Sequence, residues 1–245
     1  MKDFRNLIRI GLLSFLVGSC CIGAHDADLS LRVESSSDKS LDRKIAVERL
    51  RQATIAIIDN DSIIKLPTCT GVWIAKDLIL TAAHCVDDKN MLVVEYATKD
   101  EYSNNESSRA TLVALDEKAD LAMLLAPGNV NHPIISFSRD MISAGDSVDI
   151  VGHPVGYDWT YSLGYVSAIR NDQNGPNGIV EKTVQISSPV WMGSSGGGAF
   201  DAKGNLVGIC SWVSKNGPHL SFFIHRDVIE TFVLRNLAKI NPRSL

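Results

Sequence analysis

Short apolar runs, each bounded by turn residues, recur along most of this chain and limit the folds that it can adopt. From Ala53 onward the runs return about every dozen residues, the spacing expected of a β-barrel or a β-sandwich. The predicted strands are Thr54–Ile58, Gly71–Ala75, Leu78–Thr81, Met91–Tyr96, Ala110–Leu115, Leu121–Leu125, Ser147–Val151, Trp159–Ile169, Val180–Ser187, Gly198–Asp201, Leu206–Val213 and Leu220–Ile224. A loop at Pro127–Pro133 separates two sets of about six strands, and Asp227–Ile240 has helical apolar spacing. The sequence therefore predicts an all-β chain with a C-terminal helix.

The composition narrows the function. With 245 residues, 45% of them hydrophobic, the chain can form one large domain or two half-domains with a good core. A formal net charge of −4 argues against nucleic-acid binding, which usually needs a basic surface. We therefore expect no nucleic-acid partner, and we expect no cofactor and no metal.

The N-terminus has the character of a targeting segment. Basic residues precede the short apolar run Ile10–Val17, which is the order found in signal peptides. Small residues before Cys20 resemble a bacterial lipoprotein signal, in which residues 1–19 are removed and Cys20 is lipidated. Ordinary secretory cleavage near Gly23–Ala24 is the alternative. Either pattern predicts export to the periplasm, the cell envelope or the medium, and lipidation adds attachment to a membrane.

The segment between the leader and the first strand is expected to be a tether, residues 20–50. Asp26–Lys44 is polar and rich in serine, which is typical of a loose arm. Leu41–Gln52 has the pattern of a short helix. The folded domain is expected at residues 51–240.

Three separated motifs carry candidate chemistry. His84 lies in Thr81–Cys85, Asp120 opens an apolar run, and Ser195 lies in the glycine-rich stretch Gly193–Gly197. His, then Asp, then Ser is one of the chain orders of the serine hydrolase triad. Each motif alone is a weak signal, and their occurrence together is a strong one.

Together these motifs resemble the trypsin/chymotrypsin-fold serine proteases, and among them the bacterial HtrA (Deg) type. The resemblance covers residues 50 to 240. It implies two six-stranded antiparallel β-barrels, at about 51–127 and 134–224, with the catalytic cleft between them. No segment after the helix is expected to form the PDZ domain of full-length HtrA proteases.

The resemblance also assigns roles. Ser195 would be the nucleophile, His84 its general base, and Asp120 the acid that orients His84. Backbone N–H groups of Gly193 and Ser195 match the family's oxyanion hole, and Ser211 matches a serine that hydrogen-bonds the triad aspartate. The remaining histidines are expected to be surface or core residues: His25, His132, His153, His219 and His225.

Asp116 competes with Asp120 as the acid, but Asp120 is preferred because it stands at the start of a buried strand. Ser194 replaces the aspartate that, in digestive enzymes, pairs with a new N-terminal amine after zymogen cleavage. We therefore do not expect activation of that kind.

The cysteines agree with export. Cys69 and Cys85 flank a predicted hairpin whose ends lie close together, and the resembled family commonly has a disulfide at this position. Two reduced, buried cysteines are the alternative. Cys210 is expected to be a small buried residue.

The substrate pocket is expected to be small and uncharged. The resemblance places Pro189 at its base, where an aspartate would select Arg or Lys. Val213 would narrow the entrance, and Cys210 would line one wall. Small apolar side chains are therefore favoured, and His219 facing the pocket would instead favour an acidic residue.

The sequence thus predicts an exported serine endopeptidase that acts on proteins or peptides through an acyl-enzyme. A catalytically silent, protease-like binding protein is the alternative from another class. An esterase is disfavoured because the usual α/β-hydrolase order is Ser, Asp, His.

Overall fold

The computed structural model of the chain describes residues 34–59, 66–86, 92–97, 106–127, 131–214, 217 and 220–238. The chain divides into one unit at residues 1–39 and another at residues 40–245. Only the beginning of a helix is described in the first unit, and all described strands belong to the second. The predictions for Cys20, His25 and His219 fall outside the described residues.

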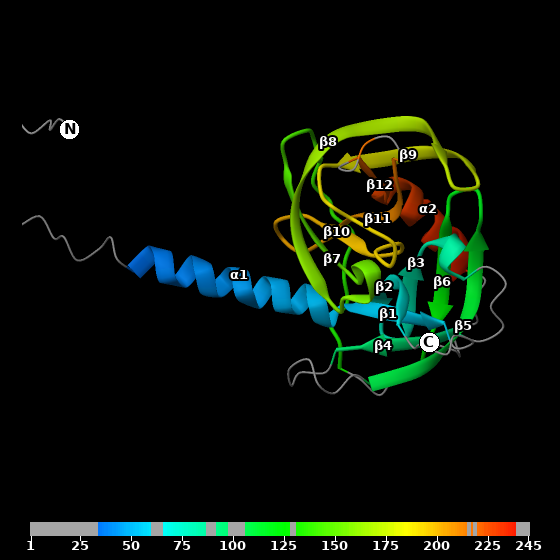
Figure 1. The fold of residues 1–245 in the computed structure, drawn as a ribbon, viewed down its shortest axis with the longest axis horizontal. Helices are drawn as coiled ribbons and strands as arrows, with labels where there is room; N and C mark the ends of the chain where they lie inside the picture. Colours follow the sequence, from blue (N-terminus) through cyan, green and yellow to red (C-terminus); the bar gives the residue numbers. More distant parts are fainter. Residues whose placement is uncertain are drawn as a thin grey trace, which may run out of the picture. The chain divides into compact units, whose positions relative to one another are not determined.

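Two closed antiparallel barrels of six strands each form the second unit (Figure 1). The first has the order β1-β2-β3-β6-β5-β4, and the second has the order β10-β11-β12-β9-β8-β7. The strands are β1 (Thr54–Asp59), β2 (Pro67–Ala75), β3 (Leu78–Thr81), β4 (Leu92–Tyr96), β5 (Glu106–Asp116), β6 (Leu121–Leu125), β7 (Ser147–Gly152), β8 (Thr160–Gly175), β9 (Gly178–Ile186), β10 (Gly198–Phe200), β11 (Leu206–Val213) and β12 (Ser221–His225). The predicted two-barrel architecture is confirmed.

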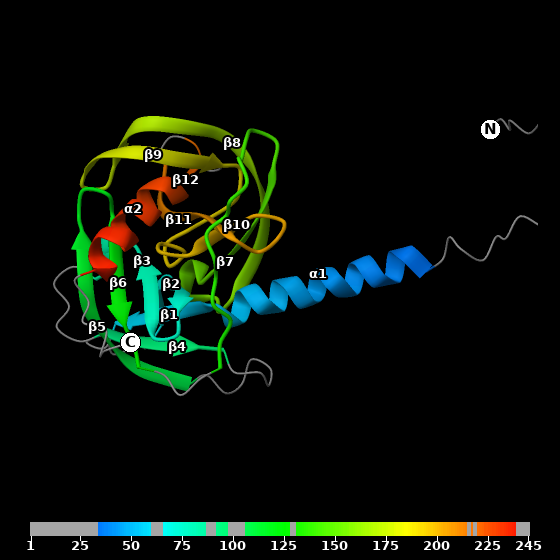
Figure 2. The same ribbon diagram turned by 180° about the vertical axis from the view of Figure 1, so that it is seen from behind.

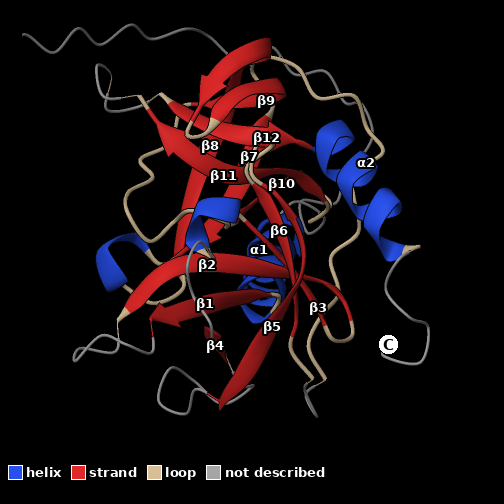
Figure 3. Ribbon diagram, turned by 90° about the vertical axis from the view of Figure 1, so that its right-hand side faces the viewer, coloured by secondary structure: helices blue, strands red, loops and turns tan. Residues whose placement is uncertain are grey.

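Each barrel encloses its own apolar core, because inward-facing side chains alternate with outward-facing ones along the strands. A third cluster brings together Leu50, Leu121, Phe200 and Phe232, which come from both barrels and both long helices. Figure 3 shows that strands dominate the fold and that helix α2 lies at its side. The third cluster is the apolar part of the barrel–barrel contact, and the site described below lies on segments from the two barrels.

The C-terminal helix α2 (Arg226–Leu237) packs against strands of both barrels, namely β6, β9, β11 and β12 (Figure 2). Its N-cap is His225, whose Nδ1 accepts a hydrogen bond of 3.1 Å from the backbone N–H of Asp227. The predicted helix is confirmed, with a start one residue earlier and an end at Leu237.

The N-terminal helix α1 (Glu34–Gln52) begins seven residues before the predicted start at Leu41. Part of the segment expected to be a loose arm is therefore helical. Arg43 ties the helix to the second barrel through hydrogen bonds to Asp149 and Tyr161, and the Tyr161 hydroxyl also donates to Asp149 at 2.9 Å. Among the described residues, no helix has both the length and the apolar character needed to cross a bilayer.

A disulfide joins Cys69 of β2 to Cys85 of the short helix η2 (Ala83–Cys85), with Cα atoms 5.9 Å apart. The predicted pairing is confirmed, and the reduced alternative does not describe this structure. In the chain-entropy model, closing a loop of this size stabilises the fold by about 3 kcal/mol. The same link fixes residue 85, and therefore the adjacent His84, against strand β2.

Candidate active site

His84 lies on η2, one residue before the disulfide, and its side chain is 30% exposed. Its ring Nδ1 lies 2.9 Å from Oδ1 of Asp120, and its backbone N–H donates to the same oxygen at 3.1 Å. Because a carboxylate can only accept, Nδ1 carries the proton and Nε2 is left with a lone pair. This is the tautomer that a general base at Nε2 needs.

Asp120 is fully buried at the end of the turn that precedes β6. Its backbone has φ +56°, a left-handed conformation that aspartate tolerates better than most residues. The Ser211 hydroxyl, from β11 of the other barrel, donates to Oδ2 of Asp120. His84 and Ser211 therefore satisfy both oxygens of a buried carboxylate that would otherwise be strongly destabilising.

Asp116, the competing candidate for the acid, makes a different set of contacts from Asp120. Its carboxylate accepts from the Ala119 N–H at 3.0 Å and pairs with Arg235 at 2.7 Å. Burial opposes ionisation, but hydrogen bonds from the backbone of Ala119 and Lys118 and the hydrogen bond and charge of Arg235 outweigh it, so the pKa of Asp116 is lowered. Asp116 stabilises the turn that presents Asp120, and among the described residues no hydrogen bond joins Asp116 to His84.

Ser195 lies in the loop between residues 191 and 196, which we call the nucleophile loop. Its carbonyl oxygen lies 3.6 Å from the Cys85 sulfur, which brings the loop next to the segment that carries His84. Gly193 and Gly196 have φ +96° and +83°, and a Cβ on either would lie within 2.2 Å of a backbone oxygen. Both positions therefore require glycine. In the part of the chain that the structure describes, no direct hydrogen bond joins the Ser195 hydroxyl to His84.

The backbone amides of Gly193 and Ser195 are not donors in any hydrogen bond among the described residues. Neighbouring amides of the nucleophile loop are used: Ser194 N–H donates to the Trp191 oxygen at 2.9 Å and Gly196 N–H to the Cys210 oxygen at 2.8 Å. The two amides expected to bind an oxyanion are thus both without a hydrogen-bond acceptor in the described fold.

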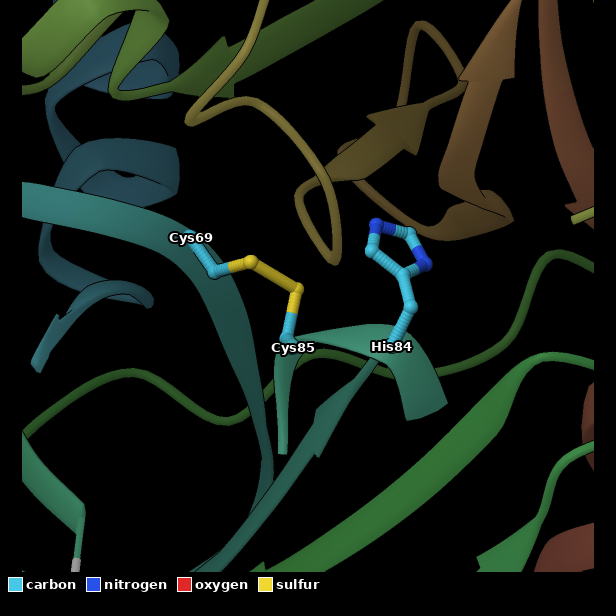
Figure 4. Close-up of side chains that lie close together, drawn as sticks. All are labelled: Cys69, His84 and Cys85. Atoms are coloured by element: carbon cyan, nitrogen blue, oxygen red, sulfur yellow. A yellow bond between two sulfur atoms is a disulfide. The ribbon is translucent and has the colours of Figure 1, made fainter. Parts of the chain in front are cut away.

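The ligand atoms of Cys69, His84 and Cys85 all lie within 4.8 Å of one another, and Figure 4 shows the three side chains side by side. The two sulfur atoms are bonded to each other. Neither can therefore act as a thiolate ligand, and the cluster offers a metal ion only one imidazole.

The predicted pocket residues differ in exposure. Pro189 is exposed, and Val213 is 37% exposed at the end of β11. Cys210 is only 3% exposed and packs in the core of the second barrel beside Val190 and Phe223. Burial, and to a lesser degree the charge of Asp120, raises the pKa of the Cys210 thiol to about 12, so this cysteine stays protonated and unreactive.

Two buried residues at the site had no motif to reveal them. Thr70, beside Cys69 on β2, donates from its hydroxyl to the Gly193 carbonyl at 2.7 Å. His153, after β7, is fully buried with Nδ1 3.1 Å from the Thr70 hydroxyl oxygen. Burial lowers the pKa of His153 to about 3, so its ring is neutral at physiological pH. His153 was expected to be an ordinary surface or core histidine, and it is a core histidine that touches the site.

Residues 69–209 match the family described as "Trypsin-like peptidase domain". A "Probable periplasmic serine endoprotease DegP-like" of Pseudomonas fluorescens is 32% identical over 164 residues, which are 65% of this chain and 33% of that protein. The "Serine endoprotease DegS" of Haemophilus influenzae is 29% identical over 158 residues, covering 64% of this chain and 45% of that protein. The chain thus spans less than half the length of these curated relatives.

Solved structures of serine proteases also superpose on this chain. A serine endoprotease from Yersinia pestis superposes with a TM-score of 0.65 at 25% identity, covering 80% of this chain and 66% of that one. The "HtrA-type protease AlgW with tripeptide" superposes with a TM-score of 0.67 at 27% identity, covering 78% of this chain and 62% of that one.

The buried His153 makes a prediction about acid stability. In the unfolded chain this histidine takes up a proton near its ordinary pKa of 6.5, whereas in the fold it does so only near 3. The unfolded state therefore binds the extra proton between these values, and the fold loses about 1.4 kcal/mol per pH unit as pH falls. His153→Asn removes this term. The free energy of unfolding of wild type minus that of His153→Asn, measured with urea, should be greatest above pH 7 and shrink toward pH 4. Parallel curves would contradict the assignment.

Proposed function

This chain belongs to the trypsin-like peptidase family, and we propose that it is an exported serine endopeptidase in which His84, Asp120 and Ser195 form the catalytic triad. The observation that carries the proposal is the array at Asp120: a buried carboxylate accepts from His84 Nδ1 and from Ser211. That array leaves His84 Nε2 as the base. The two curated relatives described above are both named as serine endoproteases, which supports the same reaction for this chain.

The proposed reaction follows from these positions. Ser195 Oγ attacks the peptide carbonyl while His84 Nε2 takes its proton, and Asp120 stabilises the imidazolium. The oxyanion is bound by the amides of Gly193 and Ser195. His84 then gives the proton to the leaving amine, and water hydrolyses the acyl-enzyme by the same steps. The proposal requires the Ser195 hydroxyl to close on His84 when substrate binds, because catalytic hydrogen bonds often tighten only in that complex.

Ser195→Ala tests the nucleophile. Casein hydrolysis should fall by about 10⁴-fold or more, because the hydroxyl is the attacking group. The melting temperature should stay close to that of the wild type, since no hydrogen bond of the described fold uses this hydroxyl. Ser107→Ala, an exposed serine on β5, is the matched control and should keep full activity. A fluorophosphonate probe should label wild type and the control but not Ser195→Ala.

The second candidate function is a catalytically silent, protease-like binding protein. The observation that favours it is the missing direct hydrogen bond between Ser195 and His84. A wild-type protein that folds, binds peptides, and neither cleaves casein nor reacts with the probe would establish this candidate and refute the endopeptidase.

For the substrate we propose a small apolar side chain on the residue that supplies the cleaved carbonyl. Pro189, the proposed pocket base, is uncharged, and Val213, the proposed entrance residue, is partly exposed, which supports the proposal. A large or cationic side chain would then meet steric overlap or an unpaired buried charge, each costing several kcal/mol.

Cut sites in a denatured proteome, mapped by mass spectrometry, test this preference. They should follow small aliphatic residues in wild type, and Val213→Gly should extend the profile toward Leu and Phe. Leu112→Ala, an apolar residue of comparable exposure on β5 of the first barrel, is the control and should leave the profile unchanged. Cleavage mainly after Lys or Arg would contradict the pocket, and cleavage mainly after Glu would transfer specificity to His219.

For localisation we propose export with lipidation at Cys20. The Cys69–Cys85 disulfide suits an oxidising compartment, and the curated relatives include proteins named as periplasmic. Signal cleavage after residue 19 would leave Cys20 as an acylated first residue, anchored by acyl chains.

Intact-mass analysis of protein from the native host's membrane fraction tests the lipid. It should show a chain that starts at Cys20 with added acyl mass, and Cys20→Ala should move the protein out of that fraction. A soluble species that starts near Ala24 without lipid would refute lipidation and leave ordinary secretion.

A further inference from the structure

We propose that Thr70 is a positioning residue that holds the nucleophile loop, and with it the oxyanion hole, from the opposite barrel. Thr70 lies on β2 of the first barrel, whereas the loop belongs to the second. The inference rests on the proposed peptidase function and adds a residue that no motif in the sequence marks.

Thr70 contacts the loop at both ends of one stretch. Its backbone N–H donates to the Ser195 carbonyl at 2.8 Å, and its hydroxyl donates to the Gly193 carbonyl at 2.7 Å. Thr70 is fully buried, so water does not compete for either bond. Two carbonyls, one on each side of Ser194, are thus fixed by a single residue.

Thr70 is itself held in place. Its own carbonyl accepts from the Thr81 hydroxyl at 2.7 Å, and its neighbour Cys69 is bonded to Cys85. The segment that carries His84 and the residue that holds the nucleophile loop are therefore joined by one covalent link. A shift of Thr70 relative to His84 would have to break this hydrogen bond or strain the disulfide.

His153 determines the direction of the key hydrogen bond. The Thr70 hydroxyl has one hydrogen, which goes to Gly193, so the hydroxyl oxygen is the acceptor for the His153 ring at 3.1 Å and backbone N–H at 3.2 Å. Nδ1 is then the protonated ring nitrogen. Because His153 occupies the acceptor side of the hydroxyl, the threonine proton is directed to the Gly193 carbonyl.

The chemical consequence concerns the amides of the oxyanion hole. The Gly193 carbonyl belongs to the peptide that joins Gly193 to Ser194, and the amides of Gly193 and Ser195 lie on the two peptides next to it. Glycine at 193 offers little resistance to peptide rotation, so the direction of these amides depends on what holds the carbonyl. Without the Thr70 hydroxyl, the buried Gly193 carbonyl would lose this donor. Because an unsatisfied buried carbonyl is costly, the peptide would tend to rotate away from its present orientation.

Three variants test the proposal. Thr70→Val keeps the shape and the backbone N–H but removes the hydroxyl, and Thr70→Ser restores it. The matched control is Thr54→Val, because Thr54 is equally buried in the first barrel and its hydroxyl donates to the Leu50 carbonyl at 2.8 Å. The control loses a comparable hydrogen bond away from the nucleophile loop.

Each variant is measured for kcat and KM on a peptide substrate and for melting temperature. Affinity is measured for a peptidyl boronic acid, whose tetrahedral adduct uses the oxyanion hole, and for the matching product peptide, which forms no such adduct. Thr70→Val should lose about 10- to 100-fold in kcat with little change in KM, as expected for a small misplacement of catalytic groups. Boronate affinity should fall in parallel while product affinity does not. Thr70→Ser should recover most of both losses.

Thr54→Val should resemble Thr70→Val in melting temperature and resemble wild type in kcat. If Thr70→Val is as active as Thr54→Val, or if boronate and product affinities fall equally, Thr70 has only a structural role and the inference is wrong, although the proposed function stands. If wild type itself neither cleaves the peptide nor binds the boronate more tightly than the product, the proposed function fails, and this inference fails with it.

Discussion

The structure of the site depends on one buried charge. Asp120 has no solvent exposure, so its carboxylate must be satisfied by protein donors, and these come from two barrels. His84 supplies a ring N–H and a backbone N–H from the first barrel, and Ser211 supplies a hydroxyl from the second. A buried carboxylate without such partners would cost several kcal/mol. The same bonds that make the charge tolerable therefore fix the tautomer of His84 and the registration of the two barrels at the site.

A second set of polar contacts crosses between the barrels beside the first. Thr70 of β2 reaches the nucleophile loop, and the Trp159 indole of the second barrel donates to the Thr54 carbonyl of the first at 3.0 Å. These hydrogen bonds act in addition to the apolar cluster shared by the barrels. Each has a specific geometry that apolar packing alone does not impose. Local sequence patterns predict the strands of each barrel, but the site forms only when the polar contacts between the two barrels are made.

Local patterns explain why much of the fold was predictable. Strands β6 and β11 were predicted with the ends that the structure has, because each is a nearly continuous apolar run with turn residues beside it. Strand β8 was predicted to end at Ile169 but continues to Gly175, since its polar second half pairs with β9 in an exposed hairpin. Likewise, the start of α1 is polar and lacks the helical spacing of apolar residues that would predict a helix from Glu34. A buried strand or helix shows a pattern of apolar residues in the sequence, whereas backbone pairing of exposed residues requires no such pattern.

The residues of the site also differ in whether a local sequence pattern reveals them. His84 and Asp120 could be selected from the sequence because each lies in a local motif, and a hydrogen bond joins them in the fold. Thr70 and His153 are 83 residues apart and become partners only when the barrels meet, so no spacing could reveal them.

Ser194 shows what such long-range partners replace. It is a buried neutral residue whose hydroxyl accepts from the Trp191 N–H at 3.4 Å, where digestive enzymes of the resembled fold use a charge. In this chain the loop is held instead by Thr70 and by the hydrogen bond from Val155 to Met192 at 2.7 Å. Among the described residues, these partners of the loop are groups within the chain from both barrels: Thr70 from the first, and Val155 and Trp191 from the second.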